Sequence, residues 1–178
     1  MRLAAGSRRR RAGGWDPDAV DEIPGYRIVF GFATDARAYE LRSTDPAADG
    51  PYLDIHLPDA TPSGEHFTAM EPQHAQVHGR AGGLVPWLVL YWFLGKVMSI
   101  GDLSGLRGPV QPLPARQVWI HNGERYTVGP YTLSEDDGGA NLIEVVPGES
   151  LTVHRTCWIP WPVFRRFLEA VERSRSNP

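Results

Sequence analysis

The sequence predicts an α+β fold, in which an antiparallel sheet packs against a buried central helix and a C-terminal amphipathic helix. Three observations support this fold class. Apolar residues alternate with period two over residues 26–34, as in a strand with one buried face. Residues 84–95 form an uncharged apolar run, and the apolar positions of residues 163–171 fall on one face of a helix. The predicted strands form an N-terminal hairpin and a C-terminal four-strand meander.

Residues 1–25 are predicted to be a disordered arm ahead of a single domain over residues 26–178. The first 14 residues contain five arginines and no acid, and residues 15–25 then contain four acids. A secretory signal would need about 7–15 apolar residues after the basic stretch, and none follows it. Cys157 is the only cysteine, which excludes an internal disulfide. We therefore expect a cytoplasmic protein, or a virion-associated one if the chain comes from a phage.

The N-terminal strands are predicted from alternation and from turn residues. Residues 26–34 form the first strand, and residues 35–36 turn the chain into a second strand, so that the two make a hairpin. A loop of Pro, Asp, Gly and Ala residues follows. A third strand over residues 52–57 places its leucine and isoleucine side chains inward, which leaves Asp54 and His56 together on the opposite face.

The apolar run of residues 84–95 is predicted to be a buried helix. Pro86 suits the first helical position, although the aromatic and β-branched residues of the run would also suit a buried strand. A membrane-spanning helix needs about 20 apolar residues, so the run is too short to span a membrane.

The C-terminal strands are separated by strong turn signals. Asn122-Gly123 indicates a tight hairpin, and Gly129-Pro130 indicates a break or bulge in the strand that follows it. The four predicted strands are residues 116–120, 125–133, 142–146 and 151–159.

The last element is predicted to be an amphipathic helix that begins near Pro162. Arg165, Arg166 and Glu169 lie on its polar face, which we expect to be exposed. The residues of its apolar face are Val163, Phe164, Phe167, Leu168 and Val171.

Four of the six histidines lie within 23 residues, interleaved with acidic residues. Asp54 and His56 share a strand face, and a helical turn would bring His74 and His78 together. These four residues could form a His/carboxylate site for zinc, iron or manganese. The alternative is that the histidines are solvated or anchor loops, because the Glu of a metalloprotease helix is absent after His74.

The distribution of charge limits where nucleic acid could bind. Without the arginines of the first 11 residues, the chain has 13 basic and 21 acidic residues, so its body would repel phosphates. Contacts with nucleic acid are therefore expected only from Arg8, Arg9, Arg10 and Arg11, aided by Arg165 and Arg166.

Two functions of different classes remain open. The first is a non-enzymatic binding or assembly protein, whose partner is a protein or a second copy, as in a phage-like or multi-subunit assembly. The chain has six tryptophans, and all of its basic residues except Lys96 are arginines. Tryptophan and arginine are enriched at protein interfaces. The second is a metal-dependent enzyme built on Asp54, His56, His74 and His78. None of the standard nucleotide-binding, hydrolase or metalloprotease motifs is present.

Overall fold

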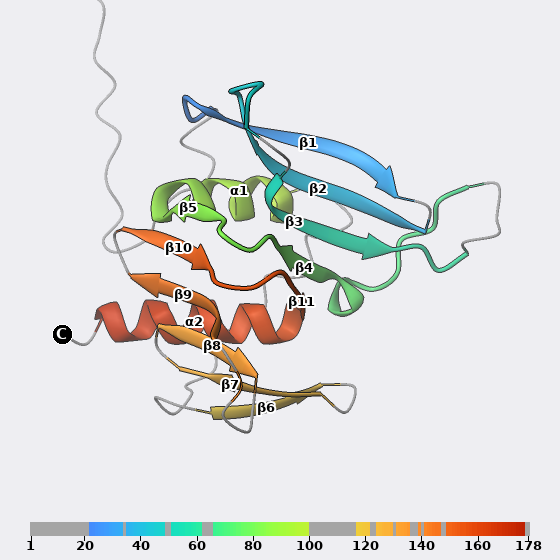
Figure 1. The fold of residues 1–178 in the computed structure, drawn as a ribbon. Helices are drawn as coiled ribbons and strands as arrows, with labels where there is room; N and C mark the ends of the chain where they lie inside the picture. The colour runs from blue at the N-terminus through green and yellow to red at the C-terminus, as the bar shows by residue number, and fades with distance from the viewer. Residues whose placement is uncertain are drawn as a thin grey trace, which may run out of the picture.

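The computed structural model describes residues 22–33, 35–48, 51–61, 66–99, 117–121, 124–129, 131–135, 139, 141–146 and 149–176. It confirms the α+β fold, with two antiparallel sheets and two helices in the described part of the chain (Figure 1). Most of the predicted arm, residues 1–21, lies outside the described residues.

The first sheet has five strands in the order β1-β2-β3-β4-β11. The predicted hairpin is confirmed, with Phe30 of β1 opposite Tyr39 of β2. The third strand is confirmed as well, and its inward residues Leu53, Ile55 and Leu57 are buried. The strands are β1 (Tyr26–Ala33), β2 (Ala36–Ser43), β3 (Pro51–Pro58), β4 (Gln76–Gly79) and β11 (Cys157–Pro160).

The second sheet has six strands in the order β5-β10-β9-β8-β7-β6. The predicted four-strand meander is in fact five consecutive strands, because the break at Gly129 separates two antiparallel strands instead of bulging one. The strands are β5 (Leu84–Pro86), β6 (Gln117–His121), β7 (Glu124–Val128), β8 (Thr132–Glu135), β9 (Asn141–Val146) and β10 (Ser150–Val153).

The prediction of a single sheet is wrong, and the cause lies in the last predicted strand. Residues 151–159 form β10 of the second sheet and β11 of the first, joined by residues 154–156. Leu151 and Val153 are buried before the crossing, and Cys157 and Ile159 after it. All four are odd-numbered, so the period-two pattern continues across the break and hides it.

The central apolar run contains two elements. Its first three residues form β5, which pairs with β10, and α1 (Trp87–Ser99) follows directly. Pro86 therefore ends the strand immediately before the first helical residue. The predicted burial of the helix is confirmed by Leu90, Phe93 and Val97, which have no exposed surface.

The C-terminal helix is confirmed as α2 (Trp161–Ser176). It contacts β4 and β11 of the first sheet and β7 and β8 of the second, so it closes the core under both sheets (Figure 1). Val163, Phe164, Phe167 and Val171 are completely buried, as the helical pattern predicts.

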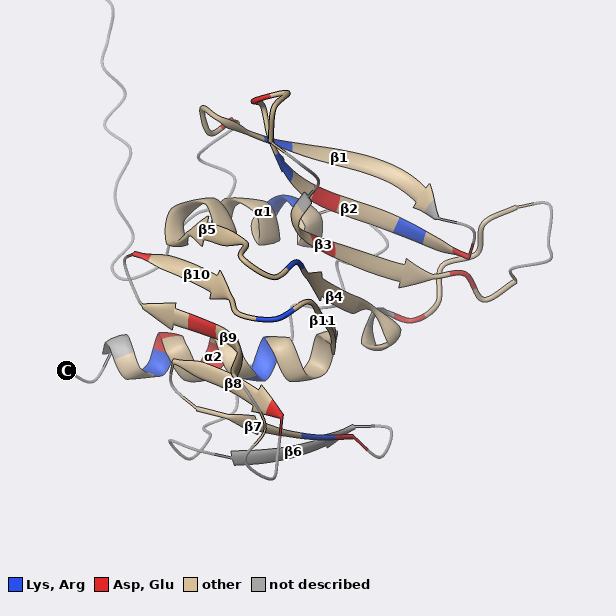
Figure 2. Ribbon diagram, viewed as in Figure 1, with Lys and Arg blue, Asp and Glu red and all other residues tan. Residues whose placement is uncertain are grey.

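The polar face of α2 differs from the prediction. Glu169 is buried, and its carboxylate accepts hydrogen bonds from Arg165 Nε at 3.1 Å and from Arg166 at 3.4 Å. Arg173 donates to the backbone carbonyl of Glu169 at 3.1 Å. Figure 2 accordingly shows basic and acidic segments side by side along α2. The two predicted surface arginines thus neutralise a buried carboxylate, which would otherwise be costly.

Candidate functional site

Three of the four predicted metal-ligating residues lie together on the outer face of the first sheet. Asp54 on β3 is opposite His78 on β4, and His56 is two residues along β3 from Asp54. His78 Nδ1 lies 3.0 Å from Asp54 Oδ1, and His56 Nε2 lies 3.7 Å from Asp54 Oδ2. The carboxylate is buried between the two imidazoles, which are each mostly buried as well.

Trp158 on β11 completes this group, which we call the imidazole cluster (Asp54, His56, His78 and Trp158). The indole stacks on His78 with ring centroids 4.5 Å apart, and it meets His56 edge-on at 4.8 Å. Sequence reasoning missed Trp158, because nothing in the sequence indicates that β11 pairs with β4. The four side chains therefore form one contacting group that spans the neighbouring strands β3, β4 and β11.

His74 does not join the imidazole cluster. The predicted helical turn over residues 74–78 is wrong: His74 ends a 3₁₀ turn (Pro72–His74), and His78 lies on a strand. His74 is exposed. Within the described ranges, no group of three or more His, Cys, Asp or Glu side chains is placed to hold a metal ion.

Of the predicted nucleic-acid contacts, the structure describes only Arg165 and Arg166. Arg8, Arg9, Arg10 and Arg11 lie outside the described residues. Arg165 and Arg166 are engaged with Glu169, and both are about three-quarters buried. The nucleic-acid partner therefore stays a prediction that depends on the N-terminal arginines.

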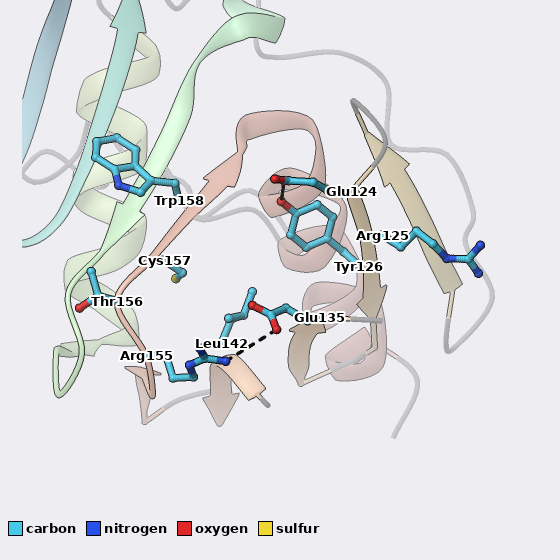
Figure 3. A pocket seen from close by; sticks show the side chains of 9 residues that line it. All are labelled: Glu124, Arg125, Tyr126, Glu135, Leu142, Arg155, Thr156, Cys157 and Trp158. Carbon is cyan, nitrogen blue, oxygen red and sulfur yellow. Dashed lines mark hydrogen bonds and ion pairs between the residues drawn. The ribbon is translucent and has the colours of Figure 1, made fainter. Parts of the chain in front are cut away.

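A cleft of about 470 Å³ opens where the chain crosses from the second sheet to the first. Tyr126 of β7 lies on one wall between two carboxylates, those of Glu124 and Glu135, and Cys157 lies across from it (Figure 3). Arg155 lies 3.7 Å from Glu135 at the entrance. The remaining lining residues are Arg125, Leu142, Thr156 and Trp158. Sequence reasoning missed this cleft, because its walls come from two sheets.

The two ionisable groups on the inner surface of the cleft are held neutral. The Tyr126 hydroxyl donates to Glu124 Oε2 at 2.5 Å, and burial together with this carboxylate raises the Tyr126 pKa far above its usual range. Burial likewise raises the pKa of the Cys157 thiol to about 11. Because the nucleophile is a thiolate, Cys157 is unsuited to nucleophilic catalysis near pH 7.

A group of aromatic side chains, two of them exposed, lies near the turn of the first hairpin. We call it the aromatic surface (Phe30, Phe32, Phe67 and Arg37). The Phe30 and Phe32 rings meet edge-on at 5.3 Å, and Phe32 meets Phe67 at 6.0 Å. The Arg37 guanidinium lies 4.2 Å from the centroid of the Phe67 ring. Phe30 is 50% exposed and Phe32 64% exposed, although both share the face of β1 that continues the core.

No known family, curated protein or solved structure shows significant similarity to this chain. In the described part of the chain, neither helix has the length and apolarity required to cross a membrane. The fold and these three features define an α+β protein with an imidazole cluster, a cleft between the two sheets and an aromatic surface.

Proposed function

We propose that the chain is a non-enzymatic assembly protein in which two copies join through β1. One observation supports this proposal most strongly: β1 is a long edge strand that presents two half-exposed phenylalanines, and no described strand pairs with its outer side. Unpaired backbone groups on such an edge are a template for another strand.

Among the described strands, the other sheet edges are protected in the usual ways, and β1 is not. Edge strands β11 and β5 have four and three residues and each ends in proline, while β6 has five residues. β1 has eight residues and contains no proline. Its only charge is Arg27 near its start, as Figure 2 shows. Natural proteins blunt long edges unless the edge is used, so this contrast favours a strand-pairing partner.

The sequence of β1 suits pairing with itself. An antiparallel pair about a two-fold axis at Phe30 places Phe30 opposite the same residue of the second copy and Ile28 opposite Phe32. Arg27 then lies opposite Ala33, so no like charges face each other. Such an isologous contact is the commonest symmetry of oligomers, and it would join the two first sheets into one.

The aromatic surface adds to the strand pairing. Phe30 would meet its counterpart in the second copy and Phe32 would meet Ile28, so both phenylalanines would lose exposed area to the interface. The Arg37 guanidinium lies over the phenylalanine rings. Aromatic and arginine side chains together are typical of interface centres. The free energy of association would come mainly from this buried aromatic group.

Sedimentation equilibrium on the full chain tests the proposal. We expect a mass near twice 19.8 kDa at loading concentrations from about 1 to 100 µM. Phe30→Lys and Phe30→Glu should each be monomeric, because like charges would then face each other across the axis. An equimolar mixture of these two variants should dimerise again, because opposite charges would face each other.

Val146→Lys is the matched control, since Val146 is 43% exposed on β9 of the second sheet. It should leave the dimer intact, and thermal melts should show that all three variants fold. A wild-type chain that is monomeric over the whole concentration range would refute the proposal. A mixture that stays monomeric would refute this register of β1.

The metal-dependent alternative rests on the two imidazoles of His56 and His78 beside the Asp54 carboxylate, although no group of three such side chains in the described part of the chain is placed to hold a metal ion. If a metal is bound, its content should fall in His78→Ala and stay unchanged in His74→Ala, because His78 lies beside Asp54 and His74 is exposed outside the imidazole cluster. Elemental analysis of protein purified without chelator measures this. Protein free of zinc, iron and manganese, with a melting temperature unaffected by added metal, would remove the alternative.

A further inference from the structure

The cleft between the two sheets has the size and lining of a small-molecule site. Its volume of about 470 Å³ lies within the usual range for such sites. Its inner surface is formed by Tyr126, Leu142 and Cys157, all of which are more than nine-tenths buried. Apolar surface of this kind can hold the body of a ligand, while the charged groups around it select the ligand's polar end.

The charged groups that face the cleft interior are mainly acidic. Glu124 lies two residues before Tyr126 on β7, and Glu135 lies opposite Tyr126 on β8. Figure 3 shows these carboxylates on opposite sides of the Tyr126 ring, whereas the Arg125 side chain extends away from it. This is the alternation of a strand, on which Arg125 projects to the other face. Arg155 is then the one basic side chain directed at the carboxylates in the described part of the cleft.

The contact of Arg155 with Glu135 is weak. The nearest nitrogen and oxygen are 3.7 Å apart, beyond the roughly 2.7–2.9 Å of a charge-assisted hydrogen bond. Both side chains are about half exposed, so solvent screens the pair. The Arg155 guanidinium is thus held only weakly near Glu135, and another cation could take its place.

We propose that this cleft binds a small organic cation, with an amidinium or ammonium group between Glu124 and Glu135 and an apolar body against Tyr126 and Leu142. The two carboxylates accept hydrogen bonds from the cation, and the intervening aromatic ring adds a cation–π contribution. The Tyr126 hydroxyl fixes Glu124 by donating to it. The neutral Cys157 thiol adds no charge to this wall of the cleft.

Isothermal titration calorimetry of the full chain with benzamidine and with benzamide tests this proposal, because the two probes have similar shapes and differ in charge. We expect benzamidine to bind and benzamide not to bind. Glu124→Gln and Glu135→Gln should each weaken benzamidine binding about tenfold or more, since each replaces a charged acceptor by a neutral one. Arg155→Ala should strengthen binding, because it removes the resident cation.

Glu149→Gln is the control, since Glu149 is exposed in the turn before β10 and outside the cleft. Its affinity for benzamidine should equal that of the wild-type chain, and thermal melts should show that every variant is folded. The proposal is overturned if neither probe binds, if both bind equally, if both glutamine variants keep wild-type affinity, or if Arg155→Ala weakens binding.

Discussion

Replacement of Phe167 by alanine is expected to lower the free energy of unfolding by about 3–5 kcal/mol. The side chain has no exposed surface, and it lies beside Phe164 with ring centroids 6.3 Å apart. α2 packs against strands of both sheets in a close-packed core, so the void left by the missing ring is not readily filled. Urea denaturation followed by far-ultraviolet circular dichroism measures the loss.

Leu168→Ala is the matched control, because Leu168 is the next residue of α2 and is only partly buried. Its cost should be clearly smaller, about 1 kcal/mol, since less apolar surface is removed from the core. Equal losses in the two variants would mean that the packed face of α2 is misplaced. All measurements should use one protein concentration, because self-association would add to the apparent stability.

Replacement of Trp92 by alanine is the second large expected effect, again about 3–5 kcal/mol. Trp92 is almost completely buried on α1, among the residues that join the helix to the core of both sheets. Its indole Nε1 has no hydrogen-bond partner among the described residues, so the stability that it contributes comes from packing. Trp92→Phe should therefore recover most of the loss, by the same denaturation measurement.

Leu88→Ala provides the contrast within the same apolar run. Leu88 is 55% exposed, so its truncation should change the free energy of unfolding by less than about 0.5 kcal/mol. A Leu88→Ala variant as unstable as Trp92→Ala would show that α1 is buried on all sides. The sequence alone does not distinguish these two positions, because the run is apolar throughout.

From the sequence, residues of a candidate site could be grouped only where they lie on the same strand or helix. Asp54 and His56 are two residues apart, and strand alternation puts them on one face. The inclusion of His78 depends on the pairing of β3 with β4, and that of Trp158 on the pairing of β4 with β11. Neither pairing has a turn signal, because long connections separate these strands. The expectation that His74 would join His78 failed because two histidines four apart suit a helix, whereas the chain is extended after His74.

The sequence by itself determined the fold class, the first hairpin, the burial of the central helix and the packed face of α2. These features follow from period and from local turn chemistry, which depend on neighbours a few residues apart. Only the tertiary structure decided that residues 151–159 divide between two sheets, that Glu169 is buried and that Phe30 and Phe32 are exposed. Periodicity shows which face of an element is apolar. It does not show which strand lies beside it or where the core ends, because those depend on contacts between residues far apart in the chain.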